Sequence, residues 1–125
     1  MNKAISLVTG ASSGIGAETA VQLSEISSHI YIVGRNIKNL ELVNDKIVKN
    51  NCECTIVPLD VTENLALENL ANSVSQKNNK IDIIVSCAGI IDQLSPIYSI
   101  NEEQLYKIVQ TNFLSNFKLI KSFHY

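Results

Sequence analysis

Thr9-Gly10-Ala11-Ser12-Ser13-Gly14-Ile15-Gly16 is the most informative segment of this sequence. An apolar run typical of a buried strand precedes it, and apolar residues recur at helical spacing after it. Glycines between a strand and a helix favour an anion site, because free backbone N–H groups and the positive end of the helix dipole face the space above the turn. We therefore predict that a phosphate group is held by the residues of this turn, namely Gly10, Ser12, Ser13, Gly14, Ile15 and Gly16.

The spacing of the glycines excludes two common nucleotide-binding motifs. It is not G-x-G-x-x-G, and it is not a P-loop, because no Lys-Ser/Thr pair follows Gly16. Thr-Gly-x-x-x-Gly-x-Gly at the end of a first strand resembles the cofactor motif of the short-chain dehydrogenase/reductase family. The resemblance implies hydride transfer between NAD(P)(H) and a carbonyl or alcohol. The alternative is a turn that only connects a strand to a helix.

Length and composition set the limits for this interpretation. The chain has 125 residues, 46% hydrophobic and 18% charged, which predicts one globular domain over residues 1–125. Its net charge is −2 and its basic residues are scattered, which argues against nucleic acid as a partner. The first apolar run is too short for a signal peptide or a membrane span. Three cysteines, an odd number, favour reduced thiols and a cytoplasmic location. Cys52-x-Cys54 has no second ligand pair, so no metal site is predicted.

Strand and helix patterns alternate four times along the chain. We expect strands over residues 4–9, 30–33, 54–59 and 81–87, and helices over 15–27, 37–50, 63–76 and 102–123. Asp60 or Thr62 is expected to cap the third helix and Asn101 the fourth. Such alternation predicts a parallel sheet with helices on both faces. The resemblance implies an α/β, Rossmann-like, doubly wound sheet with strand order 3-2-1-4, incomplete here, with its ligand over the carboxyl ends of the strands.

Arg35 follows the second predicted strand directly. In NAD-binding folds an acidic residue near this point holds the ribose 2′-hydroxyl, whereas an arginine accommodates a 2′-phosphate. Gly34-Arg35-Asn36 contains no acid and offers the only guanidinium of the chain, which suits a phosphate. We therefore expect NADP as cofactor in preference to NAD. An ordinary surface arginine is the alternative.

Two further segments match the family at the ends of strands. Asp60-Val61 resembles the pair that faces the adenine amino group, although Asp60 also suits a helix cap. Residues 86–89 resemble the Asn-Asn-Ala-Gly end of the fourth strand, so Ala88 and Gly89 are expected to contact the cofactor. Ser86 and Cys87 replace the two asparagines, and a serine restores only part of their hydrogen bonding. Cys87 is expected to be a buried, inert thiol, with a reactive thiol as the alternative.

Asn112 is unusual in the middle of a predicted helix, because asparagine is a poor helix former. It occupies the place of the family's helix asparagine, and the resemblance implies that it belongs to the catalytic tetrad and organises a water. The alternative is a solvent-facing asparagine in a sequence rich in this residue. The family's catalytic Ser and Tyr-x-x-x-Lys are absent, since no tyrosine here has a lysine four residues later.

The resemblance covers the chain but only about half of a family member. We expect a cofactor-binding half that is inactive alone and acts on a small carbonyl or alcohol only when the other half is supplied. A nucleotide-binding or protein-interaction remnant without catalysis is the alternative. Self-association is also expected, because the fourth strand has an unpaired edge and the last helix carries a broad apolar surface.

Overall fold

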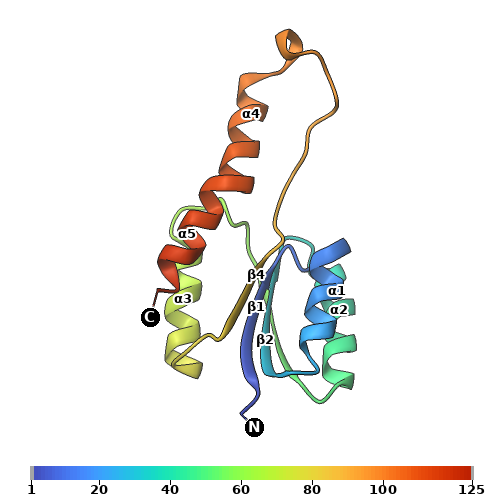
Figure 1. Cartoon of the computed structure of the whole chain (residues 1–125), viewed down its shortest axis with the longest axis vertical. Coiled ribbons are helices and arrows are strands. Elements are labelled where there is room, and N and C mark those ends of the chain that lie inside the picture. The colour runs from blue at the N-terminus through green and yellow to red at the C-terminus, as the bar shows by residue number, and fades with distance from the viewer. Residues whose placement is uncertain (1, 125) are drawn as a thin grey trace.

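A computed structural model describes residues 2–124 as one parallel sheet with helices packed on both faces (Figure 1). Met1 and Tyr125 lie outside the described residues. The strands are β1 (Ala4–Thr9), β2 (Ser27–Gly34), β3 (Glu53–Pro58) and β4 (Ile83–Ser86). The helices are α1 (Gly14–Leu23), α2 (Ile37–Lys49), α3 (Ala66–Asn78), α4 (Glu102–Val109) and α5 (Ser115–Ser122), with a 3-10 turn, η1 (Ile97–Ser99), and a π-helical turn, η2 (Gln110–Leu114).

The sheet order is β3-β2-β1-β4 and every pair is parallel, which confirms the predicted topology. Alternate residues of the inner strands face opposite sides, so the core has two parts. Leu7 and Val33 pack with α3 and α5, whereas Val8 and Ile32 pack with α1 and α2. The register pairs Thr9 with Val33 and with Ser86, so the carboxyl ends of three strands meet at one edge of the sheet.

Several element boundaries differ from the sequence-based expectation. Helix α1 ends at Leu23, and β2 already begins at Ser27, a buried residue whose hydroxyl shares a 2.7 Å hydrogen bond with that of Ser6. The predicted cap of the third helix was wrong. That helix begins only at Ala66, after Leu65 with φ of 60°, and Asp60 instead binds the backbone N–H and hydroxyl of Thr62. The polar residues that signalled a helix start form a turn before it.

The last predicted helix is interrupted. Its start is confirmed, because the Asn101 side chain accepts a hydrogen bond from the Glu103 N–H at 2.8 Å. A π turn at Gln110–Leu114 then separates α4 from α5. Figure 1 shows α5 lying beside α3 against the sheet, whereas α4 and the preceding loop project well beyond it. We call residues 90–109 the projecting arm. No helix within residues 2–124 is long and apolar enough to cross a membrane.

Candidate functional site

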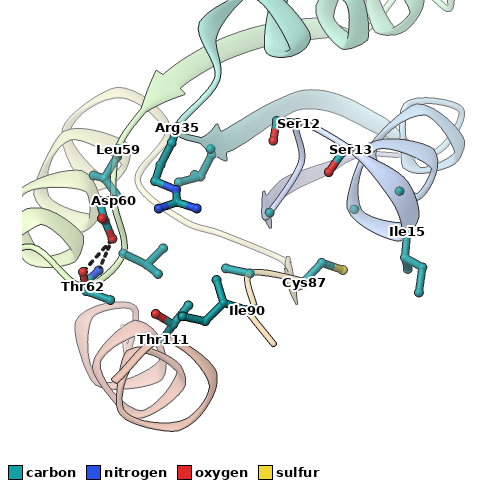
Figure 2. A pocket seen from close by; sticks show the side chains of 18 of the residues that line it. Ser12, Ser13, Ile15, Arg35, Leu59, Asp60, Thr62, Cys87, Ile90 and Thr111 are labelled. Carbon is teal, nitrogen blue, oxygen red and sulfur yellow. Dashed lines mark hydrogen bonds between the residues drawn. The ribbon is translucent and has the colours of Figure 1, made fainter. Parts of the chain in front are cut away.

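A cleft of about 680 Å³ lies at the carboxyl edge of the sheet, bounded by the glycine-rich turn, the ends of β2, β3 and β4, and the last part of α4 (Figure 2). Every residue predicted to bind the cofactor lines this cleft. These residues are Gly10, Ser12, Ser13, Gly14, Ile15, Gly16, Arg35, Asp60, Val61, Ala88 and Gly89. They come from four separate segments, so the fold brings together residues that lie far apart in the sequence.

The glycine-rich turn requires glycine for two different reasons. Gly10 and Gly14 have φ of 64° and 55°, a region that disfavours other residues. Gly16 lies against the neighbouring backbone, because a Cβ there would stand 2.1 Å from the Gly10 carbonyl oxygen. At Gly14 a Cβ would meet no atom within 4 Å, so this residue faces open space. The backbone can therefore be approached closely from the cleft.

Helix α1 begins at this turn and points its amino end at the cleft. Its cap residue Ser13 makes no side-chain hydrogen bond to the helix, and its first turn contains no acidic residue. Backbone N–H groups in the first turn of a helix have no partner within the helix, and they carry partial positive charge. The turn is thus an electropositive, sterically open feature suited to a phosphate.

Charged groups from β2 and β3 form another wall of the cleft. Arg35 is exposed at the end of β2, and Figure 2 shows it near Asp60. Asp60 Oδ1 accepts hydrogen bonds from the Thr62 N–H at 2.9 Å and from its hydroxyl at 2.7 Å. The backbone N–H of Thr62, with its hydroxyl and the charge of Arg35, lowers the pKa of Asp60 below the ordinary value. Asp60 therefore stays ionised in the neutral range and fixes this turn.

Residues 87–90 form the floor of the cleft and are held by their backbone. The N–H of Cys87 donates to the Thr9 carbonyl at 3.1 Å, and that of Ala88 to Thr9 Oγ1 at 3.3 Å. Ser86, in place of an asparagine, hydrogen-bonds with the Asn116 side chain. The expectation of a buried Cys87 was wrong. Its thiol is half-buried and lines the cleft, because β4 ends at Ser86 and leaves Cys87 beyond the sheet.

Asn112 does not line the cleft; it holds the floor in place. Its Oδ1 accepts from the Ile90 N–H at 2.8 Å, and its Nδ2 donates to the Ile90 carbonyl at 2.7 Å.

Sequence reasoning missed the cleft residues on the helix side, Lys107, Gln110 and Thr111. Lys107 and Thr111 are four residues apart and so share a helix face. This spacing was the sequence signal that could have predicted a polar helix face at the cleft.

Comparison with known proteins identifies the family. The family model described as short chain dehydrogenase matches residues 4–124. The chain belongs to the short-chain dehydrogenase/reductase family. Members of this family are oxidoreductases whose fold binds NAD or NADP. The glycine-rich turn, the sheet order and the cleft are thus features of a family fold.

Curated relatives are moderately similar in sequence. Dehydrogenase/reductase SDR family member 7 of Mus musculus is 32% identical over 118 residues, which cover 91% of this chain and 35% of that protein. The 3-oxoacyl-(acyl-carrier-protein) reductase FabG of Rickettsia conorii is 34% identical over 114 residues, covering 91% of this chain and 44% of that protein. The chain therefore spans less than half the length of these two relatives.

Solved structures of the family share the fold closely. A metagenomic short-chain oxidoreductase in complex with NADP superposes with a TM-score of 0.93 at 23% identity, over 99% of this chain and 56% of that one. NAD⁺-bound xylitol dehydrogenase has a TM-score of 0.90 at 26% identity, over 98% of this chain and 47% of that one. Both nicotinamide cofactors thus occur among the structural neighbours.

Proposed function

We propose that this chain binds NADP(H) and supplies the cofactor-binding part of an oxidoreductase that transfers hydride between NADP(H) and a carbonyl or alcohol. One observation carries the proposal. Residues predicted from four sequence motifs line a single cleft that combines an open glycine-rich turn with one guanidinium. The relative 3-oxoacyl-(acyl-carrier-protein) reductase and the structural neighbour in complex with NADP support the same class of chemistry.

In the proposed complex, the glycine-rich turn holds the pyrophosphate. The first-turn N–H groups of α1 face the cleft, and the missing side chain at Gly14 leaves room for phosphate oxygens next to the backbone. The two serines of the turn add hydroxyl donors at the same wall. The negative charge of a pyrophosphate would also be stabilised by the positive end of the helix dipole.

The adenosine end of the cofactor is proposed to lie near Arg35 and Asp60. Arg35 would pair with the 2′-phosphate through forked hydrogen bonds, and no acidic residue follows β2 to bind a 2′-hydroxyl instead. Asp60 is ionised and held by Thr62, so with Val61 it presents a fixed acceptor and an apolar surface to the adenine. These contacts favour NADP over NAD.

Asn112, the candidate for the catalytic asparagine, is proposed to act as a positioning residue in this chain, because it does not line the cleft. Its side chain holds the Ile90 backbone, which places its helix turn next to the cleft floor. Proton transfer to a carbonyl needs a positioned donor, and no tyrosine of this sequence has a lysine four residues later. We therefore expect the 125-residue chain alone to show no carbonyl reduction above background. Turnover that survives repurification and is lost in Asn112→Ala would contradict this.

Titration calorimetry with NADPH and NADH tests the cofactor proposal. Arg35→Asp should weaken NADPH binding by about 10- to 100-fold, the range expected for a hydrogen-bonded charge pair, and should leave NADH binding equal or stronger. Lys38→Asp on α2 is the matched control, because it changes the charge equally but does not line the cleft. Equal affinity of the unaltered chain for the two cofactors would show that Arg35 does not bind a 2′-phosphate.

A further inference from the structure

A chain of side-chain hydrogen bonds connects the strand ends next to the cleft floor with the last helix. The Thr9 hydroxyl donates to Ser86 Oγ at 3.4 Å, and the Ser86 hydroxyl donates to Asn116 Oδ1. Asn116 Nδ2 then donates to the Asn112 carbonyl at 2.8 Å. These contacts connect the end of β1, the end of β4 and the helix that follows the π turn. Thr9 is buried, so the chain of bonds starts inside the core.

Two carbonyls of the π turn are bound by side chains from the following helix. At Ser115 the backbone N–H donates to the Gln110 carbonyl, five residues earlier rather than four. The Ser115 hydroxyl donates to the Thr111 carbonyl, and the Asn116 amide to the Asn112 carbonyl. Ser115 and Asn116 therefore bind the carbonyls of residues four positions earlier, within the π turn.

The π turn also holds one end of the cleft floor. The last pair of the β1–β4 ladder is Thr9 with Ser86, so residues 87–90 lie beyond the sheet. Thr9 holds the start of this segment through Cys87 and Ala88. Asn112 holds its end through both backbone groups of Ile90. The floor therefore depends on the distance between the end of β1 and the π turn.

We infer that Asn116 is a positioning residue for the cofactor site. By bonding Ser86 on one side and the Asn112 carbonyl on the other, it fixes the π turn against the end of β4 and sets the position of Ile90. Ser86 stands at a strand position where the family pattern has asparagine. The Asn116 side chain brings an amide from the helix to this position. The expected effect of Asn116 on cofactor affinity rests on the proposed function. Its effect on the position of the cleft floor rests on these contacts alone.

Two substitutions separate this role from general stability. Asn116→Ala removes both bonds, and NADPH affinity should fall about fivefold to tenfold, as expected for two hydrogen bonds. Amide exchange at Ile90 should accelerate, while exchange at Leu7 and Val8 in the core stays unchanged. Asn72→Ala is the matched control, because Asn72 is exposed in the middle of α3 and does not line the cleft; it should change neither readout.

Asn116→Asp provides a test by pH. The ionised carboxylate keeps an acceptor for Ser86 but repels the Asn112 carbonyl, and a protonated carboxyl regains one donor. The affinity for NADP⁺, relative to the unaltered chain and to Asn72→Asp, should therefore improve as the pH is lowered from about 7 to about 5, near the range where a partly buried carboxyl titrates. A constant ratio would overturn the inference.

The outcomes also separate this inference from the proposed function. If Asn116→Ala binds NADPH like the unaltered chain, with unchanged exchange at Ile90, then Asn116 does not position the site even if Arg35→Asp behaves as proposed. If the unaltered chain binds no NADPH, the proposed function fails, and accelerated exchange at Ile90 alone still supports the positioning of the floor. Acceleration at Leu7 and Val8 as well would assign Asn116 a general stabilising role and overturn the inference.

Discussion

Strand β2 and the projecting arm both carry many apolar side chains, and they use them in opposite ways. Ile30 and Ile32 of β2 are fully buried, whereas Ile97 and Tyr98 of the arm are 86% and 88% exposed. Strand β2 has a strand on each side and helices over both faces. In the described part of the chain the arm has no comparable cover (Figure 1). Position in the topology, and not hydrophobicity alone, decides which residues form the core.

The cleft shows the same contrast between a well-packed wall and a weakly packed wall. The glycine-rich turn and the ends of β2 and β3 belong to the packed sheet. Lys107, Gln110 and Thr111 belong to α4 and the π turn, where neighbouring apolar side chains such as Phe113 are exposed. We expect most of the binding energy for a dinucleotide to come from the wall that belongs to the packed sheet, because its groups are already held in place before binding.

The largest expected effect compares equivalent substitutions in the two regions. Ile32→Ala should lower the free energy of unfolding by about 2–5 kcal/mol because it opens a cavity in the core. Ile97→Ala removes the same atoms from an exposed side chain and should change it by less than about 0.5 kcal/mol. Urea denaturation followed by circular dichroism measures both. Similar losses in the two variants would show that the arm is packed in solution.

Within the cleft, the comparison is between the two walls. Gly14→Val should abolish saturable NADPH binding, because the side chain would occupy the open space at the turn. Helix content should be retained, although the φ of 55° adds strain of about 1–2 kcal/mol. Thr111→Ala on the weakly packed wall should weaken NADPH only about threefold, as for one neutral hydrogen bond. Unchanged affinity in Gly14→Val would show that the turn does not hold the pyrophosphate.

Association should depend on the exposed surface around the π turn. Phe113 and Phe117 are exposed, and β4 has no partner strand on its outer side among the described residues. We expect the chain to associate or aggregate, and Phe113→Ser combined with Phe117→Ser to reduce this measurably in light scattering. Leu42→Ser on α2 is the control, since it removes an exposed apolar side chain elsewhere. A monodisperse monomer before substitution would contradict the expectation.

The smallest expected effect is a pH dependence within the packed region. His29 is buried, stacked on Tyr31 with ring centroids 4.5 Å apart, and hydrogen-bonded to Thr55 at 2.8 Å. Burial, with the charge of Lys77, lowers its pKa below 6.5, although Glu53 opposes this shift. Below pH 6.5 the unfolded chain therefore binds a proton that the folded chain does not, so stability should decrease as pH falls through that range.

His29→Gln isolates this contribution to the pH dependence. The substitution keeps hydrogen-bonding capacity but removes the titrating ring, so the stability of the variant should vary less between about pH 7.5 and pH 5.5. Asp60 and Asp82 have lowered pKa values, so they affect stability only near and below 3.8 and do not interfere. Equal slopes for the two proteins in chemical denaturation would show that His29 titrates normally.

The sequence, together with the family resemblance, was sufficient for the topology and for every side of the cleft except the helix side. Local pattern predicts the four strands and the first three helices to within a few residues, and the spacing of Gly10, Gly14 and Gly16 predicts the turn between the first strand and helix. It was insufficient where tertiary contacts override local pattern. Ser27 belongs to a strand, where it pairs with Ala4 and its hydroxyl hydrogen-bonds with that of Ser6 in the core. Asp60 binds Thr62 in a turn and does not cap the helix. The π turn leaves no residue signature that distinguishes it from an α-helix.

Backbone amide NMR shifts during NADPH titration test the central claim most directly. If the cleft is a dinucleotide site, the largest changes should fall on the turn residues 10–16, on Arg35 and on the floor residues 88–90, and they should saturate. The amide of His29, at the opposite end of the sheet, should not move. Shifts confined to the groove between α3 and α5, or no saturable shifts at the turn, would contradict the account.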